Sequence, residues 1–202
     1  AAVTAAQGLD YTGTSGTLTF AVSDTTKTFT VTINGDSLNE LTETFTATLS
    51  SPTNATLGTT FAITESISDD GDTAPTFSFS AAPYELFEGN SGTTAVTITA
   101  NLDRLSGQNI VLTYSTSDGA AAPTCPTGIT QGATVSGSDY SSATGQLTYT
   151  AGTDISKTFT VNVTGDTTVE PNECLILNLS ATSGTTVNST ATSQLVIKND
   201  DN

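Results

Sequence analysis

The residues with the clearest capacity for chemistry are carboxylates that stand at the ends of predicted strands and in the turns between them. In the second half of the chain these residues are Asp139, Asp166, Glu170, Glu173, Asp200 and Asp201. Strand ends of an antiparallel sandwich can converge at one pole, and clustered carboxylates supply the six to eight oxygens that Ca²⁺ prefers. The alternative interpretation is a set of solvated acidic turns that keep the protein soluble.

The same acids recur in the first half of the chain in the same order, which indicates an internal repeat. The repeated blocks are GLDYTGTSGTLTF at 8–20 with GSDYSSATGQLTY at 137–149, KTFTVTINGDSLNELTETF at 27–45 with KTFTVNVTGDTTVEPNECL at 157–175, and ITESISDDGD at 63–72 with LVIKNDDN at 195–202. Asp10 thus matches Asp139, and Asp36 matches Asp166. Recurrence of the acids in both copies favours cation binding over solvated turns.

The elements that must position these acids are predicted to be strands. Phe159, Val161 and Val163 alternate with polar residues, which is the period of a half-buried antiparallel strand. The first copy has the same alternation at 27–34, on Phe29, Val31 and Ile33, and is predicted to form the matching strand. Turns rich in Gly, Asp and Asn follow every 8–12 residues or so, as in a sandwich. No segment has a convincing helical pattern. We therefore expect an all-β fold of tandem immunoglobulin-like antiparallel β-sandwiches.

The two copies differ in extent. The segments FSFS, TTAVTITAN and IVLTYST add strands before the repeated blocks of the second copy, so residues 74–202 are predicted to form a complete domain of about seven strands. Residues 1–73 contain only the C-terminal strands of a repeat. Such a partial sandwich exposes an apolar face and open strand edges. We expect its completion by an upstream segment, or alternatively by strands of a partner molecule.

Composition excludes several classes of function. The chain has 20 acidic and 4 basic residues, a net charge of −16 and no His. Nucleic-acid binding requires a basic patch, and four scattered cations do not make one. No apolar run approaches the roughly 18–20 residues that span a bilayer, so membrane insertion is not expected. No nucleophile, phosphate-loop or zinc motif is present, and we expect no enzyme activity.

The two cysteines, Cys125 and Cys174, are either free thiols or a disulfide. Leu175, Leu177 and Leu179 share one face of a predicted strand, so we expect Cys174 to point the other way, toward solvent. Cys125 lies in an insertion, 118–140, that is rich in Ala, Gly, Pro and Thr. The acidic, salt-tolerant composition indicates an extracellular protein, where a disulfide that anchors this insertion is favoured.

These motifs together resemble the Calx-β domain family, which is known from sodium–calcium exchangers and many bacterial surface proteins. The resemblance is carried by G-x-DY, G-x-L-x-[FY], V-x-V-x-x-D, E-x-x-E and a terminal acidic pair, and covers nearly the whole chain. It implies calcium ligands Glu88, Asp139, Asp166, Glu170, Glu173, Asp200 and Asp201 in the second copy, and Asp10, Asp36, Glu40, Glu43, Asp69 and Asp70 in the first. Asn199 replaces an acid of the family's closing cluster, which implies fewer or weaker ions.

The function that we predict is an extracellular, calcium-binding structural or adhesive repeat of a cell-surface or filament-forming protein. Its expected partners are neighbouring repeats of the same chain or like subunits. The alternative is a module that recognises carbohydrate or protein and is attached to a larger enzyme or receptor.

Overall fold

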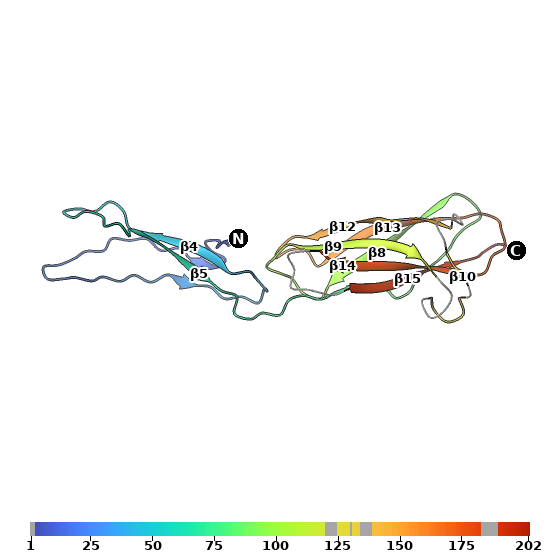
Figure 1. Ribbon diagram of the computed structural model, residues 1–202, viewed down its shortest axis with the longest axis horizontal. Coiled ribbons are helices and arrows are strands. Elements are labelled where there is room, and N and C mark those ends of the chain that lie inside the picture. Colours follow the sequence, from blue (N-terminus) through green and yellow to red (C-terminus); the bar gives the residue numbers. More distant parts are fainter. Residues whose placement is uncertain (1–2, 120–124, 130, 134–138, 183–189) are drawn as a thin grey trace. The chain divides into compact units, whose positions relative to one another are not determined.

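The computed structural model describes residues 3–119, 125–129, 131–133, 139–182 and 190–202, and these segments form strands and no helix (Figure 1). The chain divides into two compact units, Ala1–Thr73 and Ala74–Asn202, which we call the first and second units. Parts of the insertion at 118–140, including the first two residues of the GSDY motif, lie outside the described residues. Within the described segments no helix is long and apolar enough to span a bilayer.

The second unit consists of two sheets (Figure 1). The first sheet has the order β12-β9-β14-β15-β7, with β10 added beside β14, and the second has the order β11-β13-β8-β6. The strands are β6 (Phe77–Phe79), β7 (Tyr84–Phe87), β8 (Thr93–Leu102), β9 (Ile110–Asp118), β10 (Gln131–Gly132), β11 (Tyr140–Ser141), β12 (Thr144–Tyr149), β13 (Ser156–Thr164), β14 (Glu173–Ala181) and β15 (Thr190–Lys198). All-β architecture with a sandwich-like arrangement of antiparallel strands is thus confirmed.

The core of the second unit follows from the two-residue period of its strands. In β13, Phe159, Val161 and Val163 are buried, whereas Thr160 and Asn162 between them are exposed. Nine residue pairs join β13 to β8, with Phe159 opposite Ile98. Tyr114 of the other sheet stacks on Phe159 with ring centroids 4.1 Å apart. One continuous apolar layer therefore fixes the strands whose ends carry the acids.

The first unit has shorter paired segments (Figure 1). Its strands are β1 (Val3–Thr4), β2 (Tyr11–Thr12), β3 (Thr32–Ile33), β4 (Glu43–Thr48) and β5 (Ala62–Ile67). They form one sheet of order β1-β4-β5 and a second sheet of β2 and β3. The ladder of β4 and β5 pairs Glu43 with Ile67, just as that of β14 and β15 pairs Glu173 with Ile197.

The predicted strand at 27–34 is much shorter in the structure, where only Thr32–Ile33 is paired. Its counterpart β13 is held over its whole length by β8, and the described part of the first unit has no strand beside 27–31. The apolar residues there are consequently exposed: Phe29 is 49% exposed, against 6% for Phe159. The alternation of apolar and polar residues thus indicated where a strand can form. The missing neighbouring strand explains why residues 27–31 are not paired in the first unit.

Cys125 and Cys174 form a disulfide, as predicted, but Cys174 does not face solvent, because the segment that carries Cys125 and Ile129 covers this face of β14. Cys174 is on the face of β14 opposite Leu175 and Leu177, and both cysteines are buried together with Val196 of β15. Ile129 and Ile176 cover this small second core. The bridge closes a loop of 49 residues in sequence, which in the chain-entropy description stabilises the fold by about 4 kcal/mol.

Candidate metal centre

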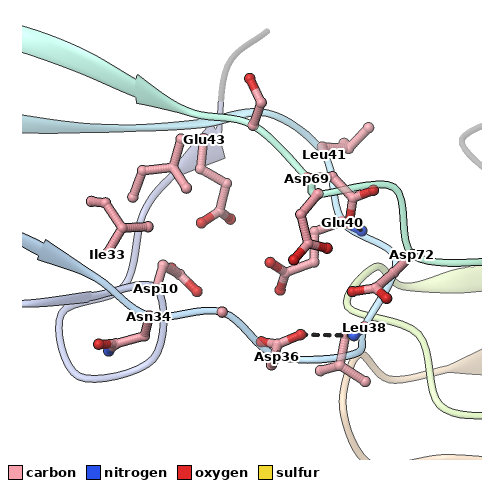
Figure 2. A pocket seen from close by; sticks show the side chains of 14 residues that line it. Asp10, Ile33, Asn34, Asp36, Leu38, Glu40, Leu41, Glu43, Asp69 and Asp72 are labelled. Carbon is pink, nitrogen blue, oxygen red and sulfur yellow. Dashed lines mark hydrogen bonds between the residues drawn. The ribbon is translucent and has the colours of Figure 1, made fainter.

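Seven carboxylates line a single pocket in the first unit (Figure 2). They are Asp10, Asp36, Glu40, Glu43, Asp69, Asp70 and Asp72. Figure 2 shows the carboxylates of Asp10, Glu40 and Glu43 directed toward a common space. Carboxylate oxygens of Asp69, Asp70 and Asp72 lie within 4.8 Å of one another. The sequence-predicted residues of the first copy are therefore gathered in one place, with Asp72 in addition.

Backbone hydrogen bonds hold these acids in position. The Leu38 amide donates to Asp36 Oδ1 at 2.7 Å, a local turn that orients the carboxylate. Asp69 accepts from the amide of Glu40 at 3.0 Å and from that of Gly71 at 3.1 Å. Gly71 has a φ of 100°, a conformation that glycine adopts without a steric penalty. The strand ends are thereby tied together through the same acids that line the pocket.

Asp10 is the most deeply buried acid of the first unit, at 8% exposure. Its backbone carbonyl accepts a hydrogen bond from the Asn34 amide at 2.9 Å, and its carboxylate accepts one from the Ala6 amide. Burial of a carboxylate is costly unless hydrogen bonds or a cation compensate it.

In the second unit, one carboxylate oxygen from each of Asp139, Glu170 and Glu173 lies within 4.8 Å of the others. Glu173 begins β14 and is only 4% exposed, while Glu170 and Asp139 are partly exposed. Two segments far apart in sequence thus bring acids to the same end of the sandwich: the residue before β11, and the turn between β13 and β14 together with the first residue of β14.

Glu88 and the C-terminal acids belong to the same region. Glu88, which follows β7, is 5% exposed, and its amide donates to the Lys198 carbonyl at 3.1 Å. Asp200 Oδ1 accepts from the Gly89 amide at 2.9 Å, and Asp201 Oδ1 accepts from the Asn90 side chain. The segment after β7 and the C-terminal segment are therefore joined through these acids.

The hydrogen-bond pattern is repeated between the units. The Thr164 amide donates to the Asp139 carbonyl at 2.9 Å, as Asn34 does to Asp10. The Thr168 amide donates to Asp166 at 2.6 Å, as Leu38 does to Asp36. The Glu170 amide donates to Asn199 Oδ1 at 3.2 Å, in the place where Glu40 donates to Asp69. Asn199 thus preserves the scaffold and supplies a neutral oxygen where the first unit has a carboxylate.

The electrostatics of both clusters reflect burial among like charges. Burial, followed by the charges of Glu170, Asp166, Asp201 and Asp200, raises the pKa of Glu88 to about 7. Burial, then the hydrogen bond and charge of Asp10, raises the pKa of Glu43 well above its usual range. The pKa values of Glu40 and Glu170 are raised for the same two reasons. Asp166 is the exception, because hydrogen bonds from the Thr168 amide lower its pKa.

The chain's own cations pair elsewhere. All four of its basic residues form ion pairs with acids outside the clusters: Lys27 with Asp24, Arg104 with Asp103, Lys157 with Asp154, and Lys198 with Glu85. In addition, Glu43 Oε2 and Asp201 Oδ2 are buried without a hydrogen-bond partner. A hard divalent cation fits such a set of oxygens, because it supplies the missing charge and coordinates the unpartnered atoms.

The sequence reasoning did not include one acid of the pocket. Asp72 is grouped with Asp69 and Asp70 in the structure, and the signal for it was its place two residues after the predicted pair. The alignment of 63–72 with 195–202 already places Asn199 at the position of Asp69, and the hydrogen bonds of both side chains agree with that alignment.

Two β units, each with acids of matching position at one end of its strands, define a tandem β-repeat protein with two candidate cation sites. A family model of the Calx-beta domain matches residues 2–71 and again residues 69–201. The chain therefore belongs to the Calx-beta family.

The chain is also similar to solved structures. The apo form of the Calx CBD1 domain is 18% identical with a TM-score of 0.49, and the match covers 64% of this chain and 100% of that one. The calcium binding domain CBD12 of CALX1.1 is 19% identical, with a TM-score of 0.48 and 62% of this chain covered. CBD12 from CALX1.2 is 19% identical, with a TM-score of 0.47 and again 62% of this chain covered. This chain spans only 46% and 44% of those two structures. A search of curated proteins found no match.

Proposed function

We propose that the chain is an extracellular calcium-binding structural repeat, with one calcium site in each unit. The observation that carries this proposal is the burial of several carboxylates together, twice in one chain, while every basic residue pairs elsewhere. One similar solved structure is described as a calcium binding domain, in agreement with this assignment.

The proposed ligands come from the acids that line each cluster. In the first unit they are Asp10, Asp36, Glu40, Glu43, Asp69, Asp70 and Asp72. In the second unit they are Glu88, Asp139, Asp166, Glu170, Glu173, Asp200 and Asp201. We expect the affinity of an extracellular module, with Kd on the order of 10⁻⁴ to 10⁻³ M. At a Kd of about 10⁻⁴ M, millimolar calcium then stabilises each site by about 1.4 kcal/mol.

Calorimetric titration of the full chain with CaCl₂ tests this assignment. We expect two classes of site, of which Glu43→Gln abolishes one and Glu173→Gln abolishes the other. Glu65→Gln is the matched control, because it removes one negative charge from an exposed position of β5 outside the pocket. Absence of binding heat, together with a melting temperature that is identical in calcium and in chelator, would refute the calcium assignment.

We further propose that the module works in an array at the cell surface, with a structural or adhesive role. The disulfide and the strong acidity support an extracellular setting. Labelling of the native protein on intact cells with an impermeant probe tests this location. Lack of labelling until the cells are lysed would count against it. Glycan-array binding by the monomer would instead support a recognition module.

The exposed face of the first unit supports a proposal about partners. We infer that residues 1–73 are a partial repeat completed by an additional β segment, from an upstream repeat of the same polypeptide or from a like subunit. Phe29, Ile33 and Leu49 are 49%, 47% and 47% exposed, whereas their counterparts in the second unit are buried. Those counterparts are covered because β8 and β9 pair with β13 and β14.

A chimaera provides the test, because the chain contains its own template for the additional strands. A copy of residues 74–118 attached ahead of residue 1 should raise the stability of the first unit and abolish its binding of a hydrophobic dye. Light scattering and dye binding of the unmodified chain then separate the two sources. A dye-binding monomer indicates completion by upstream sequence, and a dimer without dye binding indicates completion by a like subunit. A stable monomer that binds no dye would contradict both.

A further inference from the structure

A short segment runs alongside the backbone of Glu173, the most buried acid of the second unit's cluster. β10 pairs in parallel with the start of β14, with Gln131 opposite Glu173 and Gly132 opposite Cys174. The Ala133 amide then donates to the Cys174 carbonyl at 2.8 Å. Glu173 is therefore enclosed on one side by β15 and on the other by this segment.

The first unit contains the same arrangement. β1 pairs in parallel with the start of β4, with Val3 opposite Glu43 and Thr4 opposite Thr44. The Ala5 amide donates to the Thr44 carbonyl at 2.9 Å, and Ala5, like Ala133, is buried. A parallel segment beside the buried glutamate is thus a shared part of both sites, and the units differ in what holds it.

In the second unit, a covalent bond holds this region. Cys174 is the residue directly after Glu173, and its partner Cys125 lies a few residues before β10. The chain also packs tightly around Cys174: a Cβ at Gly119 would lie 1.8 Å from the Cys174 carbonyl oxygen. The first unit has Thr44 at the equivalent position, so its parallel segment is held without a bridge.

We propose that the Cys125–Cys174 disulfide positions Glu173 for calcium binding, so that the second unit's site depends on oxidation and the first unit's site does not. This inference rests on the proposed calcium function. Reduction would transfer two electrons and two protons from an external dithiol to the bridge, giving two thiols and an oxidised reagent. Among the described residues, the segment beside Glu173 would then be held by the short β10 ladder, its neighbouring hydrogen bonds and the packing of Ile129 against the second core, without a covalent link.

The expected loss of calcium affinity follows from the position of the bridge, which lies next to Glu173 in the chain and is not itself a proposed ligand. Groups that orient a metal ligand without touching the metal typically change affinity by about 10- to 100-fold when they are removed. We expect the loss to lie near the lower end, about 10-fold, because β15 still pairs with Glu173 after the bridge is opened.

The chain offers a matched control for the experiment. The paired substitution Cys125→Ser and Cys174→Thr gives the second unit the residue that the first unit has at position 44. It is made in two full-length backgrounds: Glu43→Gln, in which only the second site remains, and Glu173→Gln, in which only the first remains. Calcium titration should show about 10-fold weaker binding in the first background and less than a twofold change in the second.

A purely stabilising role for the bridge predicts a different result. The melting temperature would fall, but the calcium affinity of the second site would stay unchanged at temperatures where the protein is folded. That outcome, or an equal loss at both sites, would overturn the inference. If the variant fails to fold, titration of the Glu43→Gln protein before and after reduction with a phosphine at low temperature gives the same comparison. Absence of binding to both disulfide-intact backgrounds would instead overturn the proposed calcium function.

Discussion

Buried glutamates couple the stability of this protein to pH. Glu88 has a pKa of about 7 in the folded protein, against 4.5 for an unperturbed glutamate. Since the folded state then binds more protons than the unfolded state, the free energy of unfolding falls as pH rises from about 4.5 to about 7.

The first prediction is therefore that, in chelator, the melting temperature decreases between pH 5 and pH 7 or so. In saturating calcium this decrease should vanish or reverse, because the ion requires the ionised carboxylates. Thermal scans at several pH values, with and without calcium, measure both trends. A melting temperature in chelator that rises over this interval would contradict the assigned environment of Glu88.

The second prediction separates two effects of Glu88, its charge repulsion without calcium and its proposed binding of the ion. Glu88→Gln removes a charge that is unfavourable without the ion, so we expect the variant to be more stable than the wild type in chelator at pH 7, by up to about 3 kcal/mol. The same change removes a proposed ligand, so the gain of stability on adding calcium should shrink. Denaturant unfolding in chelator and in calcium measures both the rise in stability without the ion and the smaller gain with it. A variant that is destabilised in both conditions would indicate a purely structural role.

At the residue scale, the internal repeat was the feature that made the clustering of the acids predictable. Acids such as Asp36 and Asp166 stand in matched turns, and their local hydrogen bonds are also matched in the structure. The contribution of Asp72 was not predicted, because it depends on how the chain turns after Gly71. That turn is a property of backbone geometry, which residue type alone does not determine.

At the scale of elements, the same alternating pattern has different consequences in the two units. Phe159 and Phe29 occupy matching positions, but only Phe159 is covered. The segments that contain them read alike, so the sequence predicted two equal strands. Pairing depends on a neighbouring strand, and the described part of the first unit has none beside Phe29. The existence of the second unit's strands was predictable, whereas the extent of the first unit's strands was not.

The third prediction tests this difference. Phe159→Ala leaves a cavity in a packed core and should cost the second unit about 3–5 kcal/mol. Phe29→Ala removes a half-exposed ring and should cost the first unit about 1 kcal/mol or less. Hydrogen exchange resolved along the chain assigns each loss to its unit. Equal costs would imply that the first unit is packed as tightly as the second.

At the scale of the whole molecule, charge opposes folding. The net charge is −16, and the two acidic clusters concentrate part of it where water is partly excluded. Self-repulsion of this kind destabilises the compact state and is weakened by salt, because the Debye length falls to roughly 3 Å at 1 M ionic strength. Any cation should therefore stabilise the chain, and only a coordinated one should do so at low concentration.

The fourth prediction follows from that distinction. In chelator, raising NaCl from about 0.05 to 1 M should increase the melting temperature gradually, because screening acts on all exposed acids. At constant ionic strength, millimolar calcium should add a further increase that saturates, worth about 1.4 kcal/mol per site for a Kd of 10⁻⁴ M. Magnesium should give a smaller increase, since its demand for octahedral geometry and its tightly held waters suit these mixed carboxylate clusters less well. Equal increases from calcium and magnesium would mean that the clusters attract divalent ions by charge alone and do not coordinate them.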